Sequence, residues 1–138
     1  MTQLIPYLNF NGNCRQAMTF YQDCLGGELV LQTVGESPIA SQMPPEMTEN
    51  ILHATLTNGA INLAGSDMVG AALSPGNSVT MMLNCSSEAE INTVYANLAD
   101  GGIIGDPLQT QFWGAVFGTV SDKFGTSWML NFDKNQPQ

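Results

Sequence analysis

The residue best suited to acid–base chemistry is the chain's single histidine, His53. An imidazole gains and loses a proton near neutral pH, so His53 is the candidate catalytic residue. A general base also needs a group that positions its substrate, and the sequence identifies none. The alternative, in which His53 only forms hydrogen bonds within a binding surface, therefore stays open, as does the question whether the protein is an enzyme.

Aromatic side chains supply further candidate contacts to a ligand. Phe112-Trp113-Gly114 precedes an extended segment and favours an aromatic lid over a binding surface, with an anchor for core or dimer packing as the alternative. Tyr7 offers a hydroxyl group for hydrogen bonding. Asp67 follows Ala64-Gly65-Ser66, and we expect it to form a turn rather than to contact a ligand.

The three cysteines do not indicate a disulfide framework. Their number is odd, and no C-x-x-C spacing is present. Cys14 and Cys24 fall in one predicted helix, where their spacing separates them by about 15 Å along the axis, too far for a disulfide. Reduced, partly buried thiols are the expectation.

The charge composition excludes several classes of partner. The 138-residue chain has 3 Lys+Arg and 12 Asp+Glu, a formal net charge of −9, and its cations Arg15, Lys123 and Lys134 are scattered. Phosphate backbones and anionic membranes require clustered cations, so we expect no nucleic-acid and no membrane partner. No apolar stretch approaches the roughly 18 residues of a membrane helix, and the amino terminus lacks a basic start before an apolar run. A cytoplasmic protein is the expectation.

The elements that must position these residues follow one pattern twice. In the first half, the extended segment 4–10 precedes Asn13, a candidate helix cap. The helix is predicted from apolar residues at helical spacing and ends at Gly26-Gly27. Its apolar stripe consists of Cys14, Ala17, Met18, Tyr21 and Leu25. Strands are expected over 28–35, 51–57 and 60–64, and the segment 32–50 contains a loop.

The second half repeats this order. An extended run over 78–85 precedes Ser87 and Glu90, which have the spacing of a capping box, and the helix that follows ends at Gly101-Gly102. Strands are expected near 102–104, 115–121 and 126–132. Gly101 lies 75 residues after Gly26, and the same offset carries Leu4 onto Val79, which is expected to be the first buried position of its strand. This repetition indicates duplication.

Each half is too small to bury a sizeable core alone, so the sequence predicts one domain over 1–138. Its first module spans about 1–67, the linker about 68–77 and the second module about 78–134. The predicted fold class is α+β.

Several short motifs, in this order and spacing, resemble one known branch of proteins. They are Ile5-Pro6-Tyr7-Leu8, Phe20-Tyr21, Leu25-Gly26-Gly27, Leu52-His53-Ala54, Phe112-Trp113-Gly114, Asp122-x-Phe124-Gly125 and Trp128. Together they look like the PhnB-like branch, often labelled demethylubiquinone methyltransferase-like, of the vicinal oxygen chelate superfamily. That superfamily includes glyoxalase I, the fosfomycin and bleomycin resistance proteins and the extradiol dioxygenases. One position departs from the pattern of this branch: Lys123 stands where a proline usually follows the aspartate. We expect this difference to affect only the rigidity of the turn.

The resemblance implies two tandem β-α-β-β-β modules whose curved mixed sheet surrounds a cavity, and it implies a homodimer. Strand alternation then selects the residues that face this cavity. A hairpin turn at Asn58-Gly59 would pair Thr57 with Ala60, Thr55 with Asn62 and His53 with Ala64. The predicted ligand-binding residues are Tyr7, Asn9, Asn62, Thr80, Asn84, Phe112, Trp113, Met129 and Asn131.

The superfamily usually holds a divalent metal with four side chains. The resemblance places these ligand positions at Ile5, Asn62, Thr80 and Met129. None is a His, Asp or Glu, and isoleucine and methionine cannot neutralise a divalent ion. The sequence therefore predicts no metal site and no cofactor.

Three functions remain open at this point. The leading one is binding of a small organic molecule, neutral or cationic because the protein is acidic and lacks a cationic clamp for phosphonates. The second is a metal-dependent lyase, isomerase or thiol transferase of the glyoxalase type. The third is a non-catalytic dimeric scaffold. The sequence does not identify the ligand.

Overall fold

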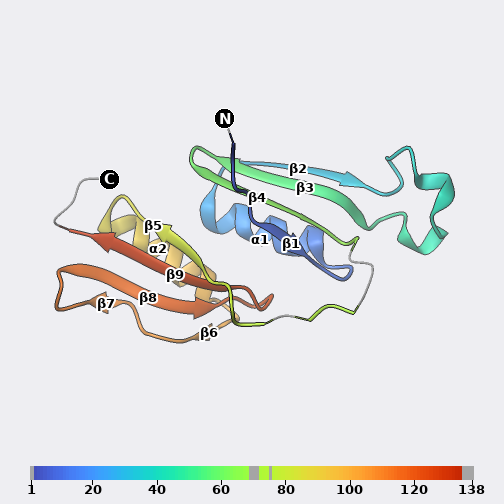
Figure 1. The fold of residues 1–138 in the computed structure, drawn as a ribbon. Helices are drawn as coiled ribbons and strands as arrows, with labels where there is room; N and C mark the ends of the chain where they lie inside the picture. The colour runs from blue at the N-terminus through green and yellow to red at the C-terminus, as the bar shows by residue number, and fades with distance from the viewer. Residues whose placement is uncertain (1, 69–71, 75, 135–138) are drawn as a thin grey trace. The chain divides into compact units, whose positions relative to one another are not determined.

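The computed structural model describes residues 2–68, 72–74 and 76–134 (Figure 1). The chain divides into two compact units, residues 1–74 and 75–138, each with one α-helix packed on one sheet. The α+β class is confirmed, and both units follow the β-α-β-β-β order, with one additional short strand in the second unit. Each unit forms its own mixed sheet. Part of the linker expected over 68–77, namely 69–71 and 75, lies outside the described residues. Within the described ranges, no helix combines the length and apolarity needed to cross a membrane.

The sheet of the first unit has four strands in the order β1-β4-β3-β2. Their bounds are β1 Tyr7–Asn9, β2 Glu28–Thr33, β3 Ile51–Asn58 and β4 Ile61–Ser66. β1 runs parallel to β4, and the other neighbours are antiparallel. The helix α1, Cys14–Leu25, packs against β2, β3 and β4.

The apolar stripe predicted for α1 forms the core of this unit. Cys14, Ala17, Met18 and Tyr21 have no exposed surface, and neither have Ile51, Ala54 and Leu56 of β3. Burying one large apolar side chain stabilises a fold by about 1.5–3 kcal/mol, so this interface holds the helix to the sheet. Because α1 covers one face of β3, the residues of β3 on the opposite face are not covered by the helix.

The start of α1 differs from the prediction. Asn13 makes no side-chain capping bond, because its φ of −115° and ψ of 21° are not the extended geometry of a capping residue. Asp67 takes this role from 53 residues away: its Oδ1 accepts hydrogen bonds from the backbone N–H groups of Gly12 and Cys14, both at 2.9 Å. Its Oδ2 accepts from the N–H of Ile51 at 2.8 Å. The buried carboxylate thus joins the start of α1, the start of β3 and the end of β4.

The paired glycines after each helix explain the repeat of 75 residues. Gly26 and Gly101 have φ of 75° and 77°, which side chains rarely adopt. A Cβ at Gly27 would overlap the carbonyl oxygen of Thr57, and a Cβ at Gly102 would overlap that of Ser121. In both units the chain must therefore leave its helix directly against a strand backbone.

The β3–β4 hairpin has a register different from the one predicted. The turn places Gly59, with φ of 60°, and Ala60 between the paired residues Asn58 and Ile61. A positive φ at the first of two central residues fits a type II′ turn rather than one centred on Asn58-Gly59. The register is displaced by two residues, so each side chain keeps its predicted face but changes its partner.

The segment between β2 and β3 is a loop, as predicted, and it is folded by local bonds. It contains two short 3-10 turns, Ala40–Gln42 and Pro45–Met47, and the N–H of Gly35 donates to the carbonyl of Thr48. β2 ends at Thr33, before the predicted bound at 35, because the Thr33 N–H and hydroxyl both donate to the Glu36 carboxylate. These bonds lower the pKa of Glu36.

The second unit has a sheet in the order β5-β9-β8-β6, with β7 paired to β8. The bounds are β5 Met81–Asn84, β6 Ile103–Ile104, β7 Gln109–Thr110, β8 Ala115–Ser121 and β9 Ser127–Asp133. β5 is parallel to β9 and the other pairs are antiparallel. The helix α2, Glu88–Ala99, packs on β8 and β9. The short strand β7 was not predicted.

The capping box at α2 is confirmed in a modified form. Ser87 Oγ accepts a hydrogen bond from the N–H of Glu90 at 3.0 Å. The Glu90 carboxylate reaches back to the N–H of Ser86, one residue before the expected partner, at 2.9 Å. The helix start is thus satisfied by local residues, in contrast to α1.

A second buried carboxylate explains the Asp122-x-Phe124-Gly125 motif. Asp122 Oδ1 accepts from the N–H groups of Phe124 at 2.8 Å and Thr126 at 3.1 Å, which closes the turn before β9. Its Oδ2 accepts from the indole Nε1–H of Trp128 at 2.8 Å. Trp128 is 1% exposed, so the carboxylate gives a core tryptophan the partner that its buried N–H requires.

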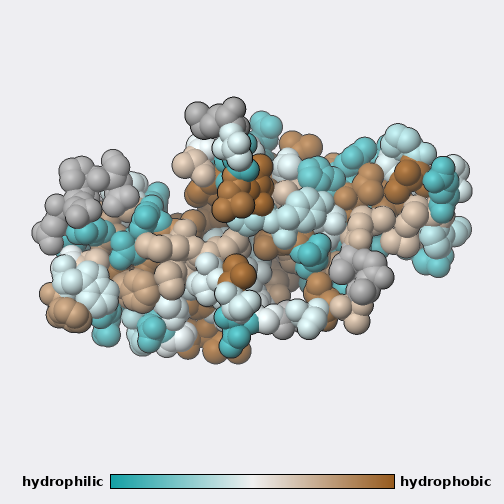
Figure 2. Space-filling model, in the orientation of Figure 1, coloured by the Kyte–Doolittle hydropathy of each residue, from teal (hydrophilic) through white to brown (hydrophobic). Residues whose placement is uncertain are grey.

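The predicted burial of Val79 is wrong. Val79 is 75% exposed, and its counterpart Leu4 is 97% exposed. The β5 ladder begins at Met81, opposite Trp128, so Val79 precedes the paired strand. Figure 2 shows the corresponding hydrophobic surface over the segment before β1, where Leu4 and Ile5 are exposed.

Candidate functional site

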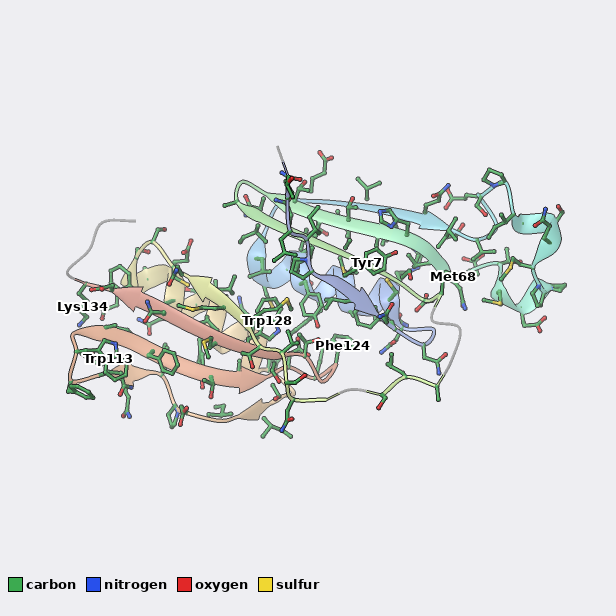
Figure 3. The ribbon with its side chains drawn as sticks, in the orientation of Figure 1. Tyr7, Met68, Trp113, Phe124, Trp128 and Lys134 are labelled. Atoms are coloured by element: carbon green, nitrogen blue, oxygen red, sulfur yellow. The ribbon has the colours of Figure 1, made fainter. Side chains whose placement is uncertain are left out.

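The first unit exposes the sheet face opposite α1, which we call the first open face. It carries Tyr7, Asn9, Val30, Gln32, His53, Thr55, Asn62 and Ala64. One cross-strand row places Tyr7 beside Ala64 and Val30 beside Thr55, with Tyr7 48% and Val30 54% exposed. Figure 3 labels Tyr7 on this sheet. The face therefore offers apolar area and polar groups to a ligand.

Tyr7 and His53 form a pair on this face. The Tyr7 hydroxyl and His53 Nδ1 share a hydrogen bond of 3.2 Å, and the two rings are stacked with centroids 5.8 Å apart at 29°. The contact orients the imidazole, and no described group bonds its Nε2. The sequence analysis had identified each residue but not their contact, which orients the imidazole of His53.

The other two predicted residues of this unit lie farther from the pair. Asn9 is exposed opposite Ser66, and Asn62 is half-buried opposite Thr57. Thr57 is four residues from His53 on β3, so the position opposite Thr57, where Asn62 lies, is displaced from His53 by about 13 Å along the strand. The predicted pairing of Asn62 with Thr55 is therefore wrong, and Asn62 lies two residues farther from His53 along the strands than predicted.

The second unit exposes a corresponding face, the second open face. It carries Met82, Asn84, Phe117, Thr119, Met129, Asn131 and Asp133. Asn131 Nδ2 donates to Asn84 Oδ1 at 3.2 Å, which joins two predicted ligand-binding residues. Met82 lies beside Met129 and is 51% exposed. Thr80 is exposed but precedes the paired strand.

Aromatic rings gather at one end of this unit. The Phe112 and Trp113 ring centroids are 4.9 Å apart at 89°, and Trp113 lies 6.3 Å from Phe117 at 64°. Phe112 is 97% and Trp113 52% exposed, so neither is a core anchor within its unit. Figure 3 shows Trp113 where β7 meets β8. Sequence reasoning missed Phe117, whose alternation with buried Val116 was the available signal.

The side chains at the four positions that the resemblance assigned to metal ligands do not suit a divalent ion. Ile5 and Asn62 belong to the first unit, and Thr80 and Met129 belong to the second. Two of these side chains lack an oxygen or nitrogen donor, and the other two are neutral. Across the described ranges, no group of three or more His, Cys, Asp or Glu side chains could hold a metal.

Cys14, Cys24 and Cys85 are buried, and none of them is in a disulfide. Burial, with a smaller effect from Asp67, raises the pKa of Cys14 to about 12, although Arg15 opposes the shift. Burial and then Glu90 raise the pKa of Cys85 to about 11. Both side chains therefore remain thiols at neutral pH and are poor nucleophiles.

We expect iodoacetamide to label the native protein slowly at pH 7.5 and the urea-unfolded protein rapidly, as measured by mass spectrometry. Equal labelling rates in the two states would contradict the burial of these thiols.

The raised pKa values of the folded-state thiols also predict an effect of pH on stability. Below pH 9 the thiols are protonated in both states, and above it the unfolded chain ionises first, so stability falls as pH rises toward 11–12.

Solved proteins with the same fold include a glyoxalase/bleomycin resistance protein/dioxygenase family enzyme from Burkholderia phytofirmans PsJN. It is 13% identical with a TM-score of 0.59, and the match covers 92% of this chain and 96% of that one. At this identity the likeness concerns the fold alone. The fold is thus glyoxalase/bleomycin resistance-like.

The chain belongs to the family described as 3-demethylubiquinone-9 3-methyltransferase, whose model matches residues 2–131. Protein YjdN of Escherichia coli (strain K12) is 34% identical over 143 residues, 97% of either chain. Protein PA1353 from Pseudomonas aeruginosa is 37% identical with a TM-score of 0.85, covering 96% of this chain and 98% of that one. A PhnB protein from Bacillus cereus is 27% identical with a TM-score of 0.75, and the match covers 95% of this chain and 99% of that one. The resemblance to the PhnB-like branch is confirmed.

Proposed function

We propose that this protein binds a small organic molecule on its open sheet faces without a divalent metal. The observation that carries the proposal is the Tyr7–His53 pair, an oriented imidazole on an exposed face with apolar neighbours. Small-molecule sites combine apolar side chains with a few fixed polar groups, and the first open face carries both kinds. His53 Nε2 supplies one hydrogen bond to the ligand, and the Tyr7 ring supplies stacking area.

The distribution of charge narrows the ligand class. Arg15 lies on α1, on the other side of the sheet from His53, and Lys123 lies in the turn before β9. The Nζ atom of Lys134 lies 3.6 Å from Oε1 of Glu88. A phosphate or phosphonate needs Arg or Lys donors beside it, and neither open face carries one. A neutral or cationic ligand fits the acidic chain better.

Methyl transfer, the activity in the family model's description, would require a methyl donor as well as a substrate. Backbone N–H groups at helix starts commonly bind anionic groups of ligands, such as phosphates and carboxylates. Here the start of α1 is occupied by Asp67, and that of α2 by Ser87. We propose binding alone, because it needs only the polar and apolar groups described on the open faces.

The test is a ligand screen followed by two substitutions. Ligands that raise the melting temperature are titrated by calorimetry into the wild type, His53→Gln and Tyr7→Phe. We expect His53→Gln to weaken binding about tenfold, because a lost hydrogen bond costs about 1 kcal/mol and the stacked ring is also removed. Tyr7→Phe keeps the ring and removes the hydroxyl, so about fivefold weakening is expected.

The control is Gln16→Ala, an exposed side chain on α1 away from the open face. It should bind like the wild type. If His53→Gln and Tyr7→Phe also bind like the wild type, the pair is not part of the ligand site.

A further inference from the structure

We propose that the three rings of Phe112, Trp113 and Phe117, together with Asp133, bind the quaternary ammonium group of a small organic cation. This inference rests on the proposed small-molecule function and gives the second open face its own ligand class. The group is called the aromatic corner below.

The ring geometry is the first step. Phe112 and Trp113 stand at 89° with centroids 4.9 Å apart, and Trp113 stands at 64° to Phe117. The planes of these rings are therefore steeply inclined to one another, and inclined aromatic rings surround quaternary ammonium groups in aromatic cages. The exposure of Phe112 and Trp113 leaves these two rings accessible to solvent in the second unit.

Local hydrogen bonds fix the backbone of the turn that carries Phe112 and Trp113. The Gln111 N–H donates to the Ala115 carbonyl at 2.7 Å, and the Gly114 N–H donates to the Gln111 carbonyl at 3.0 Å. Gly114 has φ of 96°, a conformation that suits glycine. The turn therefore presents Phe112 and Trp113 from a closed loop, which reduces the entropy lost when a ligand binds.

The carboxylate is the second, independent observation. Asp133 pairs with Ala115, where the aromatic turn rejoins β8, and it shares the face of Asn131 by strand alternation. The next residue, Lys134, falls on the α2 side, where its Nζ lies 3.6 Å from Glu88 Oε1. The second open face thus carries a carboxylate on β9, beside the strand that bears Phe117. A carboxylate next to π surfaces favours a weakly hydrated organic cation over an anion or a neutral group.

The experiment compares choline with its uncharged isostere 3,3-dimethylbutan-1-ol. The chain has two tryptophans, so a ¹⁵N spectrum contains two indole signals, which a Trp113→Phe variant assigns. We expect choline to shift the Trp113 signal saturably and to leave the buried Trp128 signal, bonded to Asp122, in place. The isostere should bind about fivefold more weakly, since cation–π contacts at such sites are worth about 1 kcal/mol.

Two substitutions complete the test. Trp113→Leu keeps apolar area but removes the π surface, and Asp133→Asn keeps the shape but removes the charge. Each should weaken choline binding, measured by calorimetry, about fivefold, while an unchanged Trp128 signal shows that the core is intact. Equal binding of choline and the isostere, or no saturable shift of the Trp113 signal with choline, would overturn the inference. The proposed function is tested separately, at Tyr7 and His53.

Discussion

Asp67→Ala is expected to lower the free energy of unfolding by about 3 kcal/mol or more. The carboxylate is 5% exposed and accepts from three backbone N–H groups, those of Gly12, Cys14 and Ile51. The substitution leaves these donors without their acceptor, and each buried donor left unpaired costs about 1–3 kcal/mol. The loss affects both the start of α1 and the start of β3, so the first unit should lose its tertiary packing first.

The measurement is urea unfolding followed by circular dichroism and fluorescence. Asp67→Asn keeps one acceptor oxygen and should lie between the wild type and Asp67→Ala. The matched control is Asp23→Ala, an exposed carboxylate on α1, which should change stability by less than about 0.5 kcal/mol. If Asp67→Ala and Asp23→Ala are equally stable, the capping role is wrong.

Asp122→Ala is expected to cost about 2–4 kcal/mol in the second unit. It removes the acceptor of the Trp128 indole and of two turn N–H groups, those of Phe124 and Thr126. The indole N–H cannot reach solvent, because Trp128 is 1% exposed. Its emission should therefore report the change directly.

A double-mutant cycle separates the indole bond from the turn bonds. Trp128→Phe removes the indole donor and leaves Asp122 bonded to the turn. We expect the two substitutions together to cost at least about 1 kcal/mol less than the sum of their separate costs, because each alone breaks the same bond. Asp100→Ala, an exposed carboxylate after α2, is the neutral control. Strict additivity in the cycle would contradict a stabilising Asp122–Trp128 bond.

The helices and the strand faces could be predicted because they depend on local periodicity. The α1 stripe from Cys14 to Leu25 became the buried core, and the glycine pairs ended both helices where expected. The predicted faces of the strand residues were correct although the predicted hairpin register was wrong. A register displaced by two residues leaves every side chain on the same face of the sheet.

Long-range pairing could not be read from the same patterns. Asp67 replaces Asn13 as the cap of α1 across 53 residues, and no local spacing indicates that choice. The Tyr7–His53 bond depends on β1 joining the sheet parallel to β4 and on the true register of the hairpin. The exposure of Val79 likewise depends on where the β5 ladder begins. The residue types of the candidate site were thus predictable, but their contacts were not.

The most direct test of the central claim uses the chain's single histidine, which gives one set of imidazole signals in protein labelled with ¹⁵N-histidine. Protein treated with EDTA and freed of metal is titrated with the ligand that most raises its melting temperature. Metal-free binding at the first open face predicts a saturable shift of the His53 signal with the same affinity before and after EDTA treatment. Binding that disappears after EDTA and returns with zinc, nickel or manganese, or that leaves the His53 signal unmoved, would contradict it.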